Sequence, residues 1–183
     1  KMIEKTAKGH TVAPVAHRVV VDAVDTDVRL GLVTEVEMTL SGLVRLRTTL
    51  TNTDEARPYQ LDEILLTLPV PTAAQEILDF SGRHLRERSP QRHAFTLGTH
   101  QRDNRRGRTG ADATLLLLVG TPGFSFGEGE VWGLHVAWSG NHRTLAERTP
   151  QGIGFLAGGE LLLPGEGQLA PGAAYSTPWV IGA

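Results

Sequence analysis

The sequence predicts an all-β fold of stacked antiparallel sheets, a sandwich or an enlarged version of one. Three observations support this fold class. Apolar and polar residues alternate with a period of two in several segments, helical spacing is almost absent, and 21 Gly and 10 Pro divide the chain into short units. With 183 residues the chain is long enough for one substantial core, so we expect a single domain.

The first predicted element is a hairpin over residues 36–51. Alternate positions are apolar on both sides of a Ser41-Gly42 turn, while Arg and Thr occupy the positions between them in the second half. This pattern predicts two paired strands with one wet face. Residues 64–70 alternate in the same way, but Pro69 and Pro71 lack the amide donors of a central strand. We therefore expect this strand at an edge of its sheet or at an exit from it.

Two apolar segments follow in the middle of the chain. The run at 115–119 is closed by Gly and Pro, which predicts a strand buried on both faces in the middle of a sheet. At 131–138, Trp132 and Trp138 share one face with apolar neighbours, whereas His135 lies on the other face. Trp132 is expected in the core and His135 as a hydrogen-bonded sheet residue. For Trp138, at the turn, core packing and sugar stacking both remain open.

The remaining segments carry less pattern. After residue 152, Gly-Gly and Pro-Gly pairs separate short apolar stretches, which predicts short strands joined by tight turns. By contrast, residues 81–112 are polar and strongly basic, and within them only "HAFTLGT", residues 93–99, alternates like a strand. No other part of this segment shows a strand pattern.

Composition excludes several kinds of partner. The chain has 18 Lys and Arg against 20 Asp and Glu, with a net charge of −2, so we expect no nucleic acid. Its apolar runs are far shorter than the roughly 20 residues that cross a bilayer, so we expect no membrane segment. There is no cysteine, which excludes a disulfide framework and favours a reducing compartment.

Few residue constellations indicate chemistry. The Arg cluster around residues 102–108 either pairs with carboxylates of a neighbouring domain or subunit or forms a solvated loop. Between His84 and His93 the only carboxylate is Glu87, and several guanidiniums would oppose a cation, so no metal site is expected there. Four carboxylates, Asp62, Glu63, Glu128 and Glu130, are formal candidates for a glycosidase pair, but their turn contexts select none.

Several blocks in order carry a family resemblance. "GRHLRERSPQRHAFTLGTHQRDNRRGRTGAD", "GTPGFSFGEGEVWGLHVAWSGNHR" and "GGELLLPGEGQLAPGAAYSTPWV" resemble the N-terminal domain of glycoside hydrolase family 36 α-galactosidases. The similarity extends from about His17 to the end of the chain. It implies an antiparallel β-supersandwich, a large two-layer sandwich, over residues 17–183, with residues 1–16 as a preceding segment.

The resemblance also implies a division of labour in a parent protein. In that family both catalytic aspartates belong to a TIM barrel that follows this domain, and no residue here matches them, so no catalytic residue is expected in this chain. The parent is expected to be a retaining α-galactosidase that acts on terminal α-galactosides without metal or organic cofactor. Expected partners are the barrel of the same parent chain and further subunits of a homo-oligomer, in the cytoplasm. The sequence looks like a piece without the early part of the domain.

Two segments carry the site residues that the resemblance implies. "RRGRTGAD" matches a family loop of the form RRGRTxHD, with Ala111 where a His is usual, and "WSGNH", residues 138–142, matches a strand end. Residues expected at an interface or beside an active site are Arg105, Arg106, Arg108, Asp112, Trp138, Asn141 and His142. Two alternatives remain: a stand-alone sugar-binding or aldose-epimerase-like sandwich, and a structural oligomerisation module.

Overall fold

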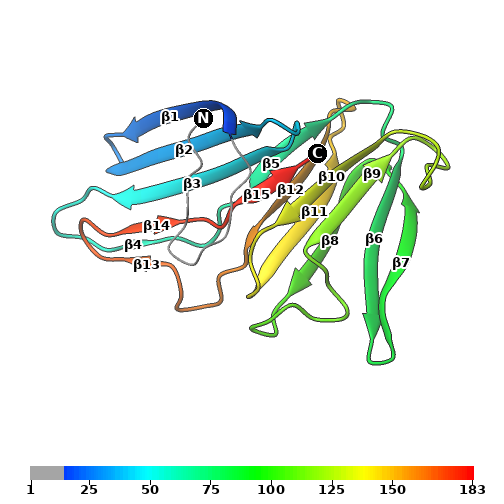
Figure 1. Ribbon diagram of the computed structural model, residues 1–183. Coiled ribbons are helices and arrows are strands. Elements are labelled where there is room, and N and C mark those ends of the chain that lie inside the picture. The colour runs from blue at the N-terminus through cyan, green and yellow to red at the C-terminus, as the bar shows by residue number, and fades with distance from the viewer. Residues whose placement is uncertain (1–14) are drawn as a thin grey trace.

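The computed structural model describes residues 15–183, and throughout this range the regular structure is β-strand without helix, which confirms the all-β prediction (Figure 1). No helix that could cross a membrane occurs between residues 15 and 183. The predicted division into residues 1–16 and 17–183 stays a prediction, because residues 1–14 lie outside the described range and β1 begins at Val15.

The larger of the two layers is a nine-stranded antiparallel sheet. Its strand order is β1-β2-β3-β15-β10-β9-β6-β7, and β14 pairs with β3 beside this path. Figure 1 shows that the strand direction turns strongly between the β1 end and the β7 end, as the right-handed twist of a large sheet requires. The strands are β1 (Val15–Asp25), β2 (Leu30–Thr39), β3 (Val44–Asn52), β6 (Glu76–Arg83), β7 (Arg86–Ala94), β9 (Leu116–Gly120), β10 (Val131–Val136), β14 (Ala174–Ser176) and β15 (Val180–Gly182).

The second layer is a four-stranded antiparallel sheet in the order β5-β12-β11-β8, and β4 pairs with β13 separately. These strands are β4 (Tyr59–Gln60), β5 (Leu66–Val70), β8 (Gly98–Asn104), β11 (His142–Arg148), β12 (Gly154–Glu160) and β13 (Gln168–Leu169). The inner faces of the two sheets bury one apolar cluster, as in a sandwich. Both sheets contribute fully buried side chains to it, including Leu117, Val119, Leu134, Val136, Ala146, Leu156 and Val180.

Three sequence predictions about strand position are confirmed. β2 and β3 form the expected hairpin, in which Gly42 adopts a φ of 87° at the turn. β9 lies in the interior of the large sheet, between β10 and β6, although its outward residues Leu116 and Leu118 are only half-buried. β5, which contains Pro69, is an edge strand of the smaller sheet.

β10 also packs as its alternation indicates. Leu134 and Val136 are completely buried, and Trp132 packs against the same cluster, so its predicted core position is confirmed. Gly133 faces the other way. A Cβ atom on Gly133 would lie 2.8 Å from Leu118 Cδ2, so a side chain at this position would require Leu118 to move.

The wet face of the β2–β3 hairpin is organised as an ion-pair layer. Glu35 and Glu37 are nearly buried there, and Arg45 and Arg47 donate to them across the strand pair. Both guanidinium groups also lie 4.7 Å from the centroid of the Trp179 ring, on which such cations are electrostatically favoured. This face is therefore polar but ordered.

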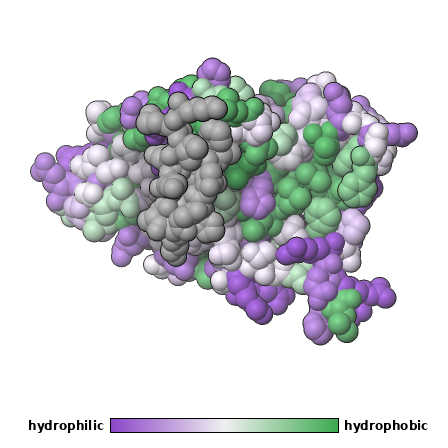
Figure 2. All heavy atoms as spheres, in the orientation of Figure 1, coloured by the Kyte–Doolittle hydropathy of each residue, from purple (hydrophilic) through white to green (hydrophobic). Residues whose placement is uncertain are grey.

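Residues 81–112 contain more strand than their sequence pattern indicates. β6 ends at Arg83, β7 covers Arg86–Ala94 and β8 covers Gly98–Asn104, whereas the part of "HAFTLGT" at 95–97 is the connection between two strands. The reason is burial: β7 is an edge strand exposed on both faces, so it has no apolar alternation. Figure 2 shows the β6–β7 hairpin as a mostly hydrophilic extension from the body.

Candidate functional site

The two segments that carry the predicted site residues lie against each other at the end of the four-stranded sheet. β8 pairs with β11, and Asn104 lies opposite His142 in the register. The Asn104 side-chain amide donates to the carbonyl oxygens of Arg108 (2.7 Å) and Gly140 (3.0 Å). The structure thus brings the loop after β8 to the turn before β11.

Asn141 provides a further tie between the loop and the turn. Its side-chain oxygen accepts a hydrogen bond of 2.7 Å from the backbone amide of Gly107, whose φ of 69° is in the region that favours glycine. Trp138 lies on the other side of the turn, with 40% of its surface exposed. Its indole covers Gly140 so closely that a Cβ there would lie 2.5 Å from Nε1. Trp138 is therefore a half-exposed aromatic group rather than a core residue.

His142 lies in the interior beneath the loop after β8 and the turn before β11. It is fully buried, and its Nε2 lies 3.2 Å from the carbonyl oxygen of Thr114. Nδ1 lies 3.1 Å from the carbonyl oxygen of Gly140 and 3.4 Å from the side-chain nitrogen of Asn104. The imidazole thereby connects β11 to both ends of the loop and stabilises the loop from within.

In the basic loop, Arg side chains both pair with carboxylates and remain exposed to solvent, so both alternatives from the sequence hold in part. Arg106 donates to Asp112 at 2.7 Å, and Arg105 lies 3.3 Å from Asp103, yet 66% and 56% of these two side chains remain exposed. The hydrogen bond from Arg106 lowers the pKa of Asp112, against a smaller effect of burial. Arg108 is also exposed. The loop is thus held by internal ion pairs while its guanidinium groups face outward.

Arg143 forms ion pairs with two carboxylates at the site. It donates from Nε and Nη2 to the two oxygens of Asp103 at 2.7 and 2.8 Å, and from Nη1 to Glu63 at 2.7 Å. This bidentate pairing lowers the pKa of Asp103 and raises that of Arg143, although burial opposes both shifts. Glu63 precedes β5, so its proximity could not be inferred from spacing in the sequence.

A pocket of about 290 Å³ adjoins the loop. Phe80, Arg88, Thr114, Leu116 and His135 line it. Burial lowers the pKa of His135, and the nearby His142 adds to the shift, so this imidazole is neutral at pH 7. With mostly apolar walls and one guanidinium group, the pocket suits a side chain of a docking partner better than a polar sugar ring.

One cluster was not predicted from the sequence. Asp79 on β6, His93 on β7 and His100 on β8 converge, and their potential ligand atoms lie within 4.8 Å of one another. Burial opposes ionisation of Asp79, but hydrogen bonds from Arg102 and His100 outweigh it and lower the pKa. No sequence spacing indicates this cluster, because its members come from three strands in two sheets. It is the group in the described range that could hold a metal ion.

Five carboxyl groups of the described range have a shifted pKa, and none of these five resembles a glycosidase general acid. A general acid needs a pKa raised toward neutrality, whereas every carboxyl group with a resolved shift has a lowered pKa. These groups are Glu35, Asp54, Asp79, Asp103 and Asp112. They are ionised partners of guanidinium or amide groups and are suited to structural roles.

Sequence comparison places most of the chain in one family. Residues 4–170 match the profile described as "Glycosyl hydrolase family 36 N-terminal domain". An α-galactosidase of Escherichia coli is 41% identical over 156 residues, which make up 85% of this chain and 22% of that protein. The chain therefore spans less than a quarter of the length of this relative.

Solved structures show the same fold. A variant of the α-galactosidase AgaA from Geobacillus stearothermophilus, in complex with 1-deoxygalactonojirimycin, superposes with a TM-score of 0.82 at 18% identity. It covers 98% of this chain, which corresponds to 29% of that chain. The α-galactosidase from Lactobacillus brevis superposes with a TM-score of 0.69 at 21% identity, covering 97% of this chain and 28% of that one.

Proposed function

Because the chain belongs to the glycosyl hydrolase family 36 N-terminal domain family, we propose that it is the non-catalytic N-terminal β-sandwich domain of a retaining α-galactosidase. In this proposal the parent protein hydrolyses terminal α-galactosides in a separate catalytic barrel without a cofactor. The present domain supports that barrel and the contacts between subunits. The observation that carries the proposal is the similarity to the E. coli α-galactosidase along a minor part of that enzyme's length.

The electrostatics of the chain support the non-catalytic role. Retaining glycosidases use two carboxyl groups about 5–5.5 Å apart, one of which must hold a proton near neutral pH. The five carboxyl groups with resolved shifts all have lowered pKa values and are engaged by cations or amides. Their chemistry suits support rather than bond cleavage.

The interface role is assigned to the loop and turn described above. Arg105, Arg106, Arg108 and Trp138 present exposed guanidinium and indole groups, which are enriched where protein surfaces meet. Asn141, His142 and Asp112 hold these groups in place. A partner with carboxylates facing this surface is the best match. The cytoplasmic location belongs to the same proposal and is supported by the absence of cysteine from the 183 residues.

The test is hydrolysis of p-nitrophenyl α-galactopyranoside by the 183-residue chain and by the full parent protein. We expect turnover by the parent and only the blank rate for the isolated chain, because the reacting carboxylates are assigned to the barrel. Mutarotation of free galactose by the isolated chain should also stay at the blank rate.

Each assay has an outcome that contradicts the proposal. Turnover by the isolated chain that persists through repurification would place the chemistry within these residues. A parent protein without α-galactosidase activity would remove the enzyme assignment. Accelerated mutarotation would favour the epimerase-like alternative.

A further inference from the structure

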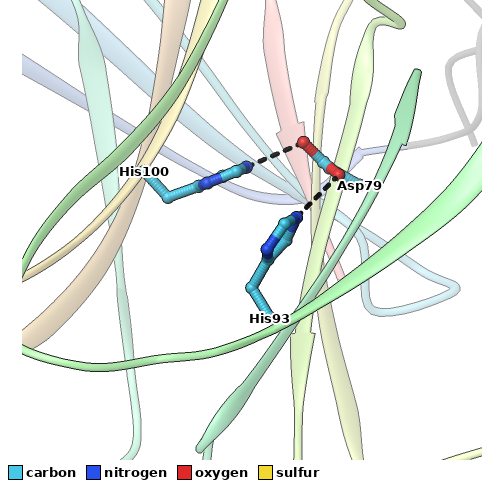
Figure 3. Close-up of side chains that lie close together, drawn as sticks. All are labelled: Asp79, His93 and His100. Carbon is cyan, nitrogen blue, oxygen red and sulfur yellow. Dashed lines mark hydrogen bonds and ion pairs between the residues drawn. The ribbon is translucent and has the colours of Figure 1, made fainter. Parts of the chain in front are cut away.

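Three side chains from different strands meet beside the β7 edge of the large sheet and the β8 edge of the small sheet. Asp79 and His93 belong to the large sheet, and His100 belongs to the small one. His100 Nε2 lies 2.7 Å from Asp79 Oδ2, and His93 Nε2 lies 3.7 Å from Asp79 Oδ1. Figure 3 shows the two imidazole rings directed at the two oxygens of the one carboxylate.

Only one of the two oxygens of the Asp79 carboxylate has hydrogen-bond partners. Its side chain is only 2% exposed, and Oδ2 accepts hydrogen bonds from His100 and from Arg102 Nε at 2.5 Å. Oδ1 is buried without a hydrogen-bond partner. The 3.7 Å distance to His93 Nε2 is beyond hydrogen-bond range. Burying a carboxylate oxygen without a hydrogen-bond partner costs free energy. A ligand bound to Oδ1 from outside the protein would remove this cost.

The atoms that could bind this ligand determine its chemical class. Two imidazole nitrogens and one carboxylate oxygen are the ligands of Zn²⁺ and neighbouring transition metals, which bind them at about 2.0–2.2 Å. Two such bonds at a tetrahedral angle separate their donor atoms by roughly 3.3–3.5 Å, close to the 3.7 Å between His93 Nε2 and Asp79 Oδ1. A pocket of about 200 Å³, with both histidines in its wall, provides access from solvent.

We propose that Asp79, His93 and His100 form a binding site for a divalent transition-metal ion of the Zn²⁺ class. His100 exchanges its hydrogen bond to Asp79 for the metal, and Arg102 stays on Oδ2 as the outer partner that orients the carboxylate. The ion then links the β6–β7 hairpin to β8, so binding stabilises the junction between the two sheets.

The guanidinium groups that argued against a metal in the sequence are arranged differently in space. Arg92 points away from His93, donating to Glu76 at 2.8 Å and to the carbonyl oxygen of Phe124 at 2.5 Å. Arg88 lines the other pocket, beside Phe80. Arg102 does contact the cluster, and its charge offsets that of Asp79. We therefore expect micromolar rather than nanomolar affinity.

The test measures metal binding directly on the 183-residue chain after treatment with a chelator. Equilibrium dialysis against ZnCl₂ should give one saturable ion per chain, and CaCl₂ should give none, because Ca²⁺ requires more oxygen ligands than the cluster offers. His93→Gln and His100→Gln should each weaken Zn²⁺ binding at least tenfold. Zn²⁺ should also raise the Tm of the unmodified 183-residue chain but not that of either variant.

A matched control comes from the same hairpin. His84 is 90% exposed and lies outside the cluster, so His84→Gln should bind Zn²⁺ as the unmodified chain does. His93 is itself 41% exposed and loses no hydrogen bond on substitution, so His93→Gln remains informative even if His100→Gln misfolds. Absence of saturable Zn²⁺ binding, or unchanged affinity in His93→Gln, would overturn the proposal.

Discussion

At the candidate site, buried polar side chains link the ends of two strands to the neighbouring loop and turn. Asn104 and His142 are almost inaccessible, and between them they reach the backbone of residues 108, 114 and 140. These contacts connect the loop after β8 and the turn before β11 to the ends of the two strands. The exposed Arg and Trp groups of the loop and turn are thus held by two side chains that are themselves hidden from any partner.

The stability of this support can be tested at His142. Replacement by alanine leaves a cavity and removes the donor to Thr114, so His142→Ala should lower the free energy of unfolding by about 2–4 kcal/mol. Urea unfolding followed by circular dichroism measures the change. His84→Ala, at an exposed position, should shift it by less than about 0.5 kcal/mol. Equal stability of His142→Ala and the unmodified chain would show that the ring contributes no support.

Between elements, the two sheets pack closely where β10 faces β12. Gly158 on β12 lies against the buried side chains of β10: an added Cβ would be 2.7 Å from Val136 Cγ2 and 2.8 Å from Leu134 Cδ2. Real Cβ atoms do not pack this closely, and the β-branched Val136 has little freedom to move aside. The distance between the layers therefore depends on the absence of a side chain at this position.

A single methyl group at Gly158 tests that packing. Gly158→Ala should destabilise the chain by about 1–3 kcal/mol, because overpacking a sandwich core forces the strands apart or the side chains off their rotamers. Denaturant unfolding is again the measurement. Gly127→Ala is the matched control, since nothing lies within 4 Å of a Cβ there, and it should be close to neutral. If Gly158→Ala proved as stable as this control, the two sheets would have to be looser than the structure shows.

Across the whole molecule, ionised carboxylates stabilise the fold. Hydrogen bonds from guanidinium groups, or for Asp54 first from backbone amides, lower the pKa of five carboxyl groups distributed over both sheets and the loops. Burial likewise lowers the pKa of His135. For these six groups the folded chain binds protons less readily than the unfolded chain, so their contribution to stability falls as the pH falls.

The expected result is progressive acid destabilisation. A group with a lowered pKa contributes stability above its unfolded pKa and loses it as the pH falls through the folded value. The loss should begin near pH 6.5 with His135 and steepen below about pH 4 as the carboxylates are protonated. Urea midpoints between pH 7 and pH 3 provide the measurement. Asp103→Asn, which lacks one of these carboxylates, should show a shallower fall, and a midpoint that rose on acidification would contradict the assignment.

Part of the fold could be predicted because its signals lie within short segments of the sequence. The β2–β3 hairpin, the interior position of β9 and the edge position of β5 follow from alternation, an apolar run and Pro69, each within a few residues. Alternation reports that one face of a strand is buried. β7 has no buried face, so its residues produced no pattern and the strand was missed.

The sequence by itself determined the fold class, the position of several strands and the family, because periodicity, turn residues and matching blocks are properties of contiguous residues. Only the tertiary structure decided which distant side chains meet. Glu63 reaches Arg143, and Asp79 meets His93 and His100, through strand pairing and through the packing of one sheet on the other. Such proximity depends on how far each sheet twists and on which edges come together, and no spacing along the chain encodes either.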